Sequence, residues 1–121
     1  MTVYGTSMMD TLLDKDRLVI IKLFYKPQNG DIVVISHGKE YTKPIIKRVI
    51  AVEGQTLSID FETGDVIVDG EVLNEPYIRN ATTKKEDGEI PEVIPQGYIF
   101  VMGDNRQNSL DSRSKEIGLI K

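Results

Sequence analysis

The sequence predicts a β-dominated fold built from antiparallel strands, with little helix. The chain has 121 residues, 40% of them hydrophobic, which is enough for the core of a single domain. Its apolar residues fall in short runs rich in Val and Ile that are bounded by Gly, Pro, Asn and Asp, a pattern typical of strands joined by turns. No stretch longer than one or two helical turns shows a convincing helical period. We therefore expect one mainly β domain over residues 1–121.

Three apolar runs in the first half of the chain predict strands. Residues 17–23 are β-branched and apolar, and residues 32–35 follow a dense turn signal at 26–31. The third run covers residues 45–52. The polar segment 36–40 between the last two runs contains glycine and is expected to be a hairpin loop. These strands are expected to form a meander.

The second half continues with shorter elements. Residues 56–60 and 66–72 alternate apolar and polar side chains, as expected for hairpin strands with one face toward solvent. The polar segment 74–92 is expected to be a mobile loop or excursion. Residues 98–102 predict another apolar strand, and residues 118–121 form an apolar stub with no partner following it.

Composition argues against several classes of function. The chain has no cysteine, so a thiol nucleophile, a disulfide and a thiolate metal site are excluded. The single histidine, His37, has no second ligand at a metal-binding spacing, and we expect neither a metal nor a cofactor. With 15 Lys and Arg against 19 Asp and Glu, and no basic segment interleaved with aromatics, nucleic acid is not an expected partner. No run approaches the ~18–20 apolar residues of a membrane span.

Two residues are candidates for chemistry. Ser7 lies close to Gly5, just before a strand-like run; the alternative is a turn hydroxyl at the surface. Lys47 and Arg48 interrupt the apolar strand at 45–52, and alternation sends one of the two inward. A buried lysine has a lowered pKa and can act as a general base. The alternative is that Lys47 reaches outward to solvent while Arg48 pairs with a carboxylate.

The third candidate is a polar block at residues 103–113, which directly follows the strand predicted at 98–102. It reads Gly-Asp-Asn-Arg-Gln-Asn-Ser-Leu-Asp-Ser-Arg. Acids, bases and hydroxyls at this density can pair with one another while they hold a hydroxyl in place. The alternative is a solvated turn capped by Asp and Asn.

Four motifs in this chain occur in the order found in type I signal peptidases. Residues 5–12, Gly-Thr-Ser-Met-Met-Asp-Thr-Leu, resemble G-x-S-M-x-P-T-L, and residues 30–34 resemble the G-D-I-V-V strand. Residues 47–54 resemble the K-R-V-I-G-x-P-G segment, and residues 103–113 match G-D-N-R-x-x-S-x-D-S-R throughout. The chain departs from these motifs at Asp10, Ala51 and Glu53. The sequence as a whole therefore resembles the bacterial Ser-Lys dyad class of signal peptidases.

The resemblance implies roles for individual residues. Ser7 would be the nucleophile and would offer its backbone N–H to the oxyanion, while Lys47 would be the general base and Ser109 would orient the Lys47 amine. Some members carry a second oxyanion donor at the position of Gly5, so backbone or water would supply it here. The implied ion pairs bracing the site are Arg48 with Asp104, and Asp111 with Arg113. The implied substrate-contacting residues are Met8, Leu12, Val34, Ile45 and Ile46.

The resemblance also implies a fold and an activity. The sheets would coil into a partly barrel-like arrangement, and the domain would act on the extracytoplasmic face of the cell membrane. There it would remove signal peptides from exported preproteins as a serine endopeptidase that cuts after small residues at Ala-x-Ala-like sites. The substrate would pair as an added strand beside residues 43–46. Members also carry an N-terminal membrane helix and a strand after the position of residue 120, and both are expected to be missing from this sequence.

Two other functions remain open at this point. A LexA-type self-cleaving regulator domain shares a Ser-Met start and a strand lysine, but lacks the block at residues 103–113. An inactive paralogue would bind signal peptides without cutting them, and Asp10, where the motif has proline, is the residue that supports it. A cleavage assay on a peptide with an Ala-x-Ala site separates an active peptidase from a binding module.

Overall fold

The computed structural model describes residues 5–13, 15, 27–35, 45–76, 78, 81–83, 88, 90–107, 109, 111–114 and 118–120. These residues contain β-strands and no helix. The strands are β1 (Ile32–Ile35), β2 (Ile45–Val52), β3 (Leu57–Asp60), β4 (Asp65–Val68), β5 (Glu71–Val72) and β6 (Ile99–Met102). The predicted strand at 17–23, the predicted hairpin loop at 36–40 and His37 lie outside the described residues. Within the described ranges, no helix has the length and apolar character needed to cross a membrane.

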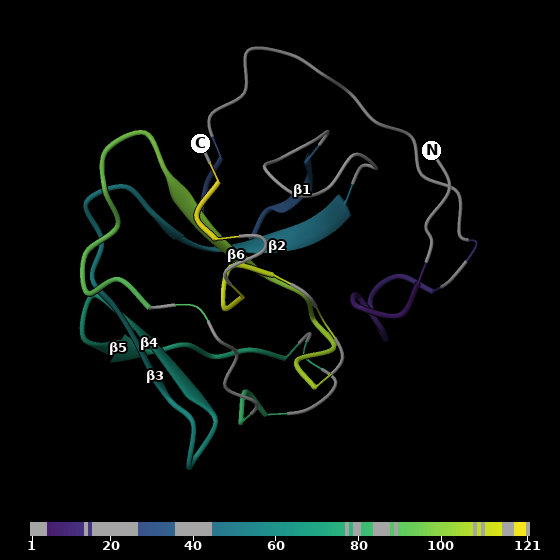
Figure 1. Ribbon diagram of the computed structural model, residues 1–121. Helices are drawn as coiled ribbons and strands as arrows, with labels where there is room; N and C mark the ends of the chain where they lie inside the picture. The colour runs from purple at the N-terminus through teal and green to yellow at the C-terminus, as the bar shows by residue number, and fades with distance from the viewer. Residues whose placement is uncertain are drawn as a thin grey trace.

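The strands form two antiparallel sheets of three strands each, with the orders β1-β2-β6 and β3-β4-β5 (Figure 1). The long strand β2 is the centre of the first sheet. It pairs with β1 from Ile35↔Ile45 to Ile32↔Arg48, and with β6 on its other side. The register with β6 shifts between Val49 and Ala51, which marks a bulge. The mainly β, antiparallel fold expected from the sequence is confirmed.

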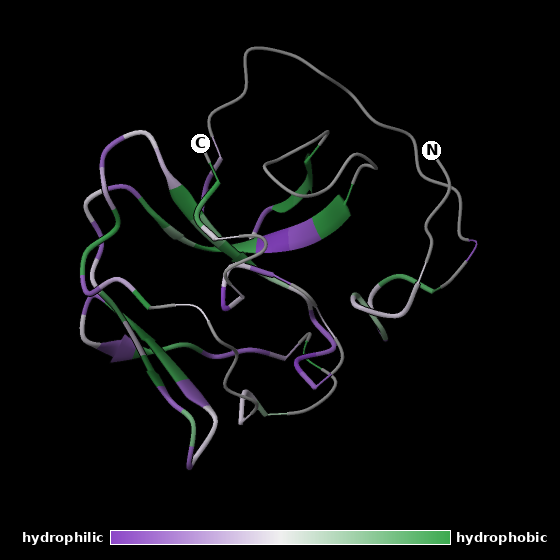
Figure 2. Cartoon of the chain, in the orientation of Figure 1, coloured by the Kyte–Doolittle hydropathy of each residue, from purple (hydrophilic) through white to green (hydrophobic). Residues whose placement is uncertain are grey.

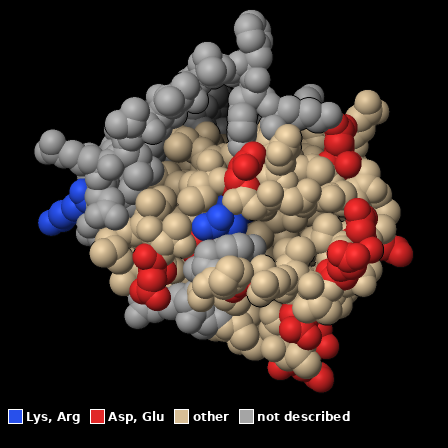
Figure 3. Space-filling model, turned by 180° about the vertical axis from the view of Figure 1, so that it is seen from behind, with Lys and Arg blue, Asp and Glu red and all other residues tan. Residues whose placement is uncertain are grey.

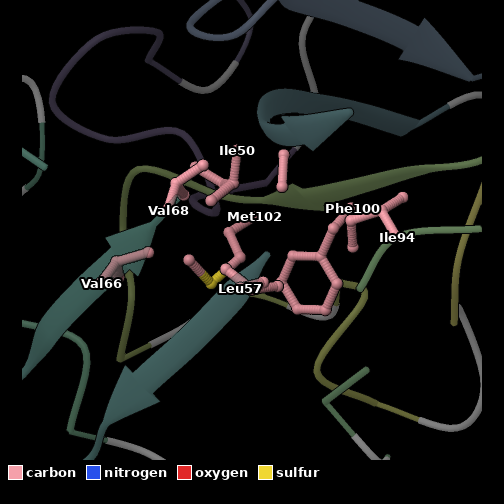
Figure 4. Close-up of a cluster of buried hydrophobic side chains, with 8 residues drawn as sticks. Ile50, Leu57, Val66, Val68, Ile94, Phe100 and Met102 are labelled. Carbon is pink, nitrogen blue, oxygen red and sulfur yellow. The ribbon is translucent and has the colours of Figure 1, made fainter. Parts of the chain in front are cut away.

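One hydrophobic cluster joins the two sheets, because β2 and β6 of the first sheet and β3 and β4 of the second all contribute to it (Figure 4). Its buried members are Ile50, Ala51, Leu57, Val66, Val68, Ile94, Phe100 and Met102. A second cluster on the first sheet contains Val33, Ile35, Val49 and Val101. Strand β6 therefore contributes to both clusters, and Phe100, Val101 and Met102 are fully inaccessible to solvent.

The prediction of one strand at residues 66–72 is wrong, because a turn at Asp69 and Gly70 divides it into β4 and β5. Both turn residues have positive φ, 51° and 80°, as a two-residue hairpin loop of the primed type requires. Asp-Gly is a strong signal for such a turn. The apolar alternation that continues from Val66 to Val72 concealed it.

Two segments that the sequence left unpaired have contacts in the fold. The apolar stub pairs with the start of β6, since the N–H groups of Ile99 and Ile120 each donate to the other's carbonyl, at 2.7 and 2.9 Å. In the segment 74–92, Thr82 is fully buried, and the N–H of Gly88 donates to the carbonyl of Arg113 at 2.9 Å. Mobility of this segment stays a prediction.

Figure 3 shows the charged side chains of the described residues on one face of the molecule. On the face shown in Figure 3, Asp and Glu side chains lie along the right and lower right edge and also near the centre, and the described Lys and Arg form no broad patch. A nucleic-acid surface would instead gather basic side chains on one face or stripe. The expected absence of a nucleic-acid partner stays a prediction.

Candidate active site

A hydrophilic stretch occupies the middle of β2, inside an otherwise hydrophobic sheet (Figure 2). Its charged residues are Lys47, which is 4% exposed, and Arg48, whose side chain is 11% exposed. The sequence predicted that alternation sends one of the two inward, and in the structure both side chains are largely buried. A buried charge is tolerated only where partners compensate for its lost hydration. Lys47 and Arg48 therefore need compensating partners within the fold.

Ser7 lies against Lys47. The Lys47 Nζ and Ser7 Oγ atoms are 2.6 Å apart, although the two residues are 40 positions apart in the sequence. The pKa of Lys47 is lowered from its usual 10.5 to about 8 because burial disfavours the ammonium. The negative charge of Asp111 raises this pKa in part, and the positive charge of Arg113 lowers it. A neutral amine at this distance from a hydroxyl can accept its proton.

Among the described residues, the buried arginines are paired with carboxylates, whereas Lys47 is not. The described pairs are Arg48–Asp104 (two bonds of 2.8 Å), Arg113–Asp111 (two bonds of 2.9 Å) and Arg106–Glu75 (2.6 Å). Each of these three carboxylates is thus held by an arginine, in two cases through both oxygens. Among the described residues Lys47 has no salt-bridge partner of its own. This arrangement favours the uncharged amine.

Asp104 connects β2, which carries Lys47, to the segment that carries Ser7. Its carboxylate accepts two hydrogen bonds from the Arg48 guanidinium and one from the Thr11 hydroxyl. Its backbone N–H points at the sulfur of Met8, 3.4 Å away. Asp104 is completely buried, so these contacts form within the protein interior. The pairing of Arg48 with Asp104 that the resemblance implied is present in the structure, and it also ties residues 8–11 to β2.

Asn105 holds the backbone around Ser7. Its N–H donates to the Ser7 carbonyl at 2.8 Å, and its side-chain amide donates to the Thr6 carbonyl at 3.0 Å. Asn105 is 6% exposed. It was not among the residues singled out from the sequence, although it lies within the matched block at 103–113.

Gly103 lies where the block passes close to Ser7. A Cβ added there would overlap the Ser109 hydroxyl and the Ser7 carbonyl oxygen. The glycine is therefore required by close approach of two chain segments, which is one of the general uses of this residue. Its N–H donates to Asp111 Oδ2 at 3.0 Å.

Ser109 forms its hydrogen bond with Asp111. The Ser109 hydroxyl donates to Asp111 Oδ2 at 2.8 Å, and the same oxygen accepts from Gly103 and from Arg113. Burial acts to raise the pKa of Asp111, but the hydrogen bonds and charge of Arg113, together with hydrogen bonds from Gly103 and Ser109, lower it below its usual value. The structure thus places Ser109 beside Gly103 and Asp111, and its role in orienting Lys47 stays a prediction.

Four of the five expected substrate-contacting residues lie together. Met8 and Ile46 form a buried pair, 2% and 7% exposed, and Leu12 and Val34 pack against it. Ile45 packs against the second cluster instead, so the structure does not bring it to the other four. The apolar group beside the nucleophile therefore comes from the segment that carries Ser7 and from β1 and β2. Gly5, the expected position of a second oxyanion donor, is exposed.

Arg106 is a second residue that sequence reasoning did not single out. It is completely buried and donates to the Gly103 carbonyl at 2.7 Å and to the Thr82 hydroxyl at 2.8 Å, in addition to its ion pair with Glu75. It thereby ties the segment 74–92 to the block that contacts the dyad. Its place in the G-D-N-R motif was the available signal, but its partners are 24 and 31 positions away.

Known proteins have sequences and a fold similar to those of this chain. The family model described as "Signal peptidase, peptidase S26" matches residues 1–121. A probable signal peptidase I-1 from Synechocystis sp. is 42% identical over 117 residues, which cover 88% of this chain and 57% of that protein. A signal peptidase I from Bacillus licheniformis is 38% identical over 128 residues, or 98% of this chain and 67% of that protein. The chain thus spans about three fifths of the length of the curated relatives it matches.

A solved structure of a signal peptidase I has a fold similar to that of this chain. The crystal structure of a signal peptidase I from Enterococcus faecalis matches with a TM-score of 0.65 and 26% identity, over 80% of this chain and 91% of that one. The resemblance inferred from the four motifs is confirmed by the sequence and structural matches together. With a family match over all 121 residues and relatives above 30% identity, the chain belongs to the signal peptidase family, peptidase S26.

Proposed function

We propose that this chain is the catalytic domain of a membrane-associated serine endopeptidase that cleaves N-terminal signal peptides from exported preproteins. Ser7 is the nucleophile and Lys47 is the general base. The observation that carries the proposal is the 2.6 Å distance between Lys47 Nζ and Ser7 Oγ, for a lysine whose pKa is lowered to about 8. Membership of the signal peptidase family supplies the substrate class.

The reaction follows from the dyad. The neutral Lys47 amine takes the proton of the Ser7 hydroxyl as Oγ attacks the carbonyl carbon of the scissile peptide bond. The oxyanion that forms on the substrate accepts a hydrogen bond from the Ser7 N–H. The Lys47 ammonium then donates its proton to the departing amine, which leaves an ester on Ser7. Lys47 next deprotonates a water that attacks this ester, and the proton returns to Ser7 as the new carboxyl end departs.

The surrounding residues support the dyad and bind the substrate. The Arg48–Asp104 pair braces β2 against the nucleophile segment, and the Asp111–Arg113 pair fixes the carboxylate that influences the charge on Lys47. The apolar group of Met8, Leu12, Val34 and Ile46 accepts small side chains one and three positions before the cut. The substrate lies extended beside the start of β2 and pairs as an added strand.

The proposed location is the cell membrane, with the catalytic domain on the extracytoplasmic face. Exported preproteins present their signal peptides at that membrane, and relatives of this chain carry the name signal peptidase I. A LexA-type self-cleaving function is not favoured, because the family match covers the whole chain, including the block at residues 103–113.

Cleavage of a peptide with an Ala-x-Ala site by the full-length protein tests the proposal. We expect Ser7→Ala and Lys47→Arg each to lower kcat by about four orders of magnitude or more, because a dyad acts as a unit and a guanidinium does not deprotonate. The wild-type rate should rise with pH through one ionisation near 8, since the free amine is the active form.

Lys15 is exposed and lies eight positions after Ser7, so Lys15→Arg provides the matched control for Lys47→Arg. Lys15→Arg should retain the wild-type rate and pH profile. Turnover retained by Lys47→Arg would contradict the general-base assignment. A wild type that binds the peptide with the same affinity as Ser7→Ala and does not cut it would instead identify an inactive signal-peptide-binding protein.

A further inference from the structure

We propose that Asn105 is a positioning residue that aims the Ser7 N–H at the oxyanion formed during peptide cleavage. The inference rests on the proposed peptidase function and deepens it. It begins from one contact, in which the Asn105 side-chain amide donates to the Thr6 carbonyl at 3.0 Å. Asn105 is not proposed to contact the substrate. It acts by orienting the peptide bond between Thr6 and Ser7.

The geometry of the peptide unit makes this contact consequential. The Thr6 carbonyl and the Ser7 N–H belong to one planar trans peptide, in which they point in opposite directions. Any group that fixes the direction of the carbonyl oxygen therefore fixes the direction of the N–H. The Thr6 oxygen faces the Asn105 amide in the 103–113 block. The Ser7 N–H, on the other side of the same peptide plane, therefore points away from Asn105. A hydrogen bond at the carbonyl also polarises the amide and makes its N–H a stronger donor.

Asn105 also holds the next peptide unit. Its own N–H donates to the Ser7 carbonyl at 2.8 Å, so the peptide planes on both sides of the nucleophile contact the same residue. With both planes held, rotation about the backbone bonds of Ser7 is restricted. The direction of the N–H and the placement of Oγ beside Lys47 are then set together. Preorganised donors of this kind are the usual source of oxyanion stabilisation.

The two contacts differ in how they respond to mutation. The backbone contact to Ser7 is available to any residue at position 105 except proline, whereas the contact to Thr6 requires a side-chain donor. Asn105 is 6% exposed, so solvent has little access to replace that donor. The Thr6 carbonyl also accepts a hydrogen bond from the Met9 N–H at 3.1 Å, so a substitution at position 105 removes one of its donors and loosens the Thr6–Ser7 peptide while leaving Ser7 and Lys47 themselves unchanged.

Substitution in the full-length protein tests the inference. Asn105→Ala removes the donor, and Asn105→Leu removes it while keeping a side chain of similar shape. We expect either variant to lower kcat by about tenfold to a hundredfold, less than the loss of an oxyanion donor itself. KM, and binding of the uncut peptide measured in a Ser7→Ala background, should change by less than about twofold. The ionisation near pH 8 should persist, because the environment of Lys47 is unchanged.

A peptide aldehyde with the same Ala-x-Ala sequence provides the specific readout. Ser7 adds to the aldehyde carbon and the resulting oxygen occupies the oxyanion position, so the variants should bind the aldehyde more weakly by about the factor by which kcat falls. Gln107→Ala is the matched control, since it removes an exposed side-chain amide of the same block that donates to the Ala81 carbonyl. It should leave kcat and aldehyde affinity at their wild-type values.

Several outcomes would overturn the inference. These are an unchanged kcat in both Asn105 variants, a rise in KM with kcat preserved, or a fall in kcat with unaltered aldehyde affinity. An equal loss of affinity for the aldehyde and for the uncut peptide would show a merely structural role. If the wild type itself neither cuts the peptide nor binds the aldehyde, the proposed peptidase function fails and the inference falls with it.

Discussion

At the scale of single residues, Lys47 combines its proposed catalytic role with a penalty to stability. Its pKa is about 8 in the folded protein against an ordinary 10.5, mainly because burial removes the ammonium from water. Between these values the unfolded chain binds more protons than the folded one. Stability therefore rises with pH from about 8 to about 10.5, and the penalty is fully present below pH 8. Lys47 thus destabilises the folded protein at neutral pH, at the position where the proposed dyad requires an amine.

Replacing this amine should stabilise the protein at neutral pH. We expect Lys47→Met to raise the free energy of unfolding by about 3 kcal/mol at pH 7, at about 1.4 kcal/mol per unit of the pKa difference, while activity is lost. The gain should shrink toward zero as the pH approaches 10.5. Urea unfolding of wild type and variant at several pH values measures this difference. An equal gain at pH 7 and pH 10.5 would show that packing, and not the buried charge, is responsible.

The sequence indicated Ser7 and Lys47 as candidates for chemistry, and the family resemblance added the bracing ion pairs, but neither pointed to Asn105. Ser7 and Lys47 stood out because each carries its chemistry in its own side chain, and because a misplaced charge in an apolar strand is visible in the sequence. Asn105 acts through backbone carbonyls of Thr6 and Ser7, nearly 100 positions away. Nothing in the composition of an Asn-Arg pair indicates which carbonyls it contacts.

At the scale of elements, the polar block after β6 behaves as part of the interior. The sequence left open a solvated turn at residues 103–113, but Asp104, Arg106, Asp111 and Arg113 are completely inaccessible to solvent. Their burial is tolerated because each charge is paired and hydrogen-bonded. Removal of a single partner would leave an uncompensated charge inside the protein. The block lies in the interior because it directly follows the buried strand β6.

Gly103 stands at this junction, and adding a methyl group there should displace the nucleophile. The Ser109 hydroxyl could rotate away from a new Cβ, but the Ser7 carbonyl is backbone and is held by Asn105. We expect Gly103→Ala to push the nucleophile segment away from Lys47 and to lower kcat about a hundredfold or more, since misplacement by about 1 Å has effects of this size. Peptide cleavage kinetics measure the change.

Gly54→Ala separates this effect from a general loss of stability. Gly54 lies in the turn after β2 with φ of +83° and open space around it, so a methyl group there strains the backbone without touching the site. This variant should melt at a lower temperature yet keep the wild-type kcat. If Gly103→Ala also melts early but retains its kcat, the close approach at residue 103 does not position the nucleophile.

At the scale of the whole molecule, the site and the core share strand β6. Phe100 and Met102 belong to the cluster that joins the two sheets, Val101 belongs to the second cluster, and Gly103 follows at once. Local patterns located β1, β2, β3 and β6 closely, because each needs only a short apolar run and flanking turns. The division into sheets β1-β2-β6 and β3-β4-β5 depends on pairing between distant segments, which local patterns do not encode.

The shared strand predicts that the active site and the core unfold in one transition. Ile94 is 1% exposed in the cluster between the sheets and takes no part in the described contacts of the dyad, so Ile94→Ala creates a cavity away from the chemistry. We expect it to lower the free energy of unfolding by about 2–5 kcal/mol while kcat at 25 °C stays within about twofold of wild type. Circular dichroism and residual peptide cleavage, followed over the same urea series, should give one midpoint. Loss of cleavage at a lower urea concentration than loss of the β signal would show instead that the site opens independently of the core.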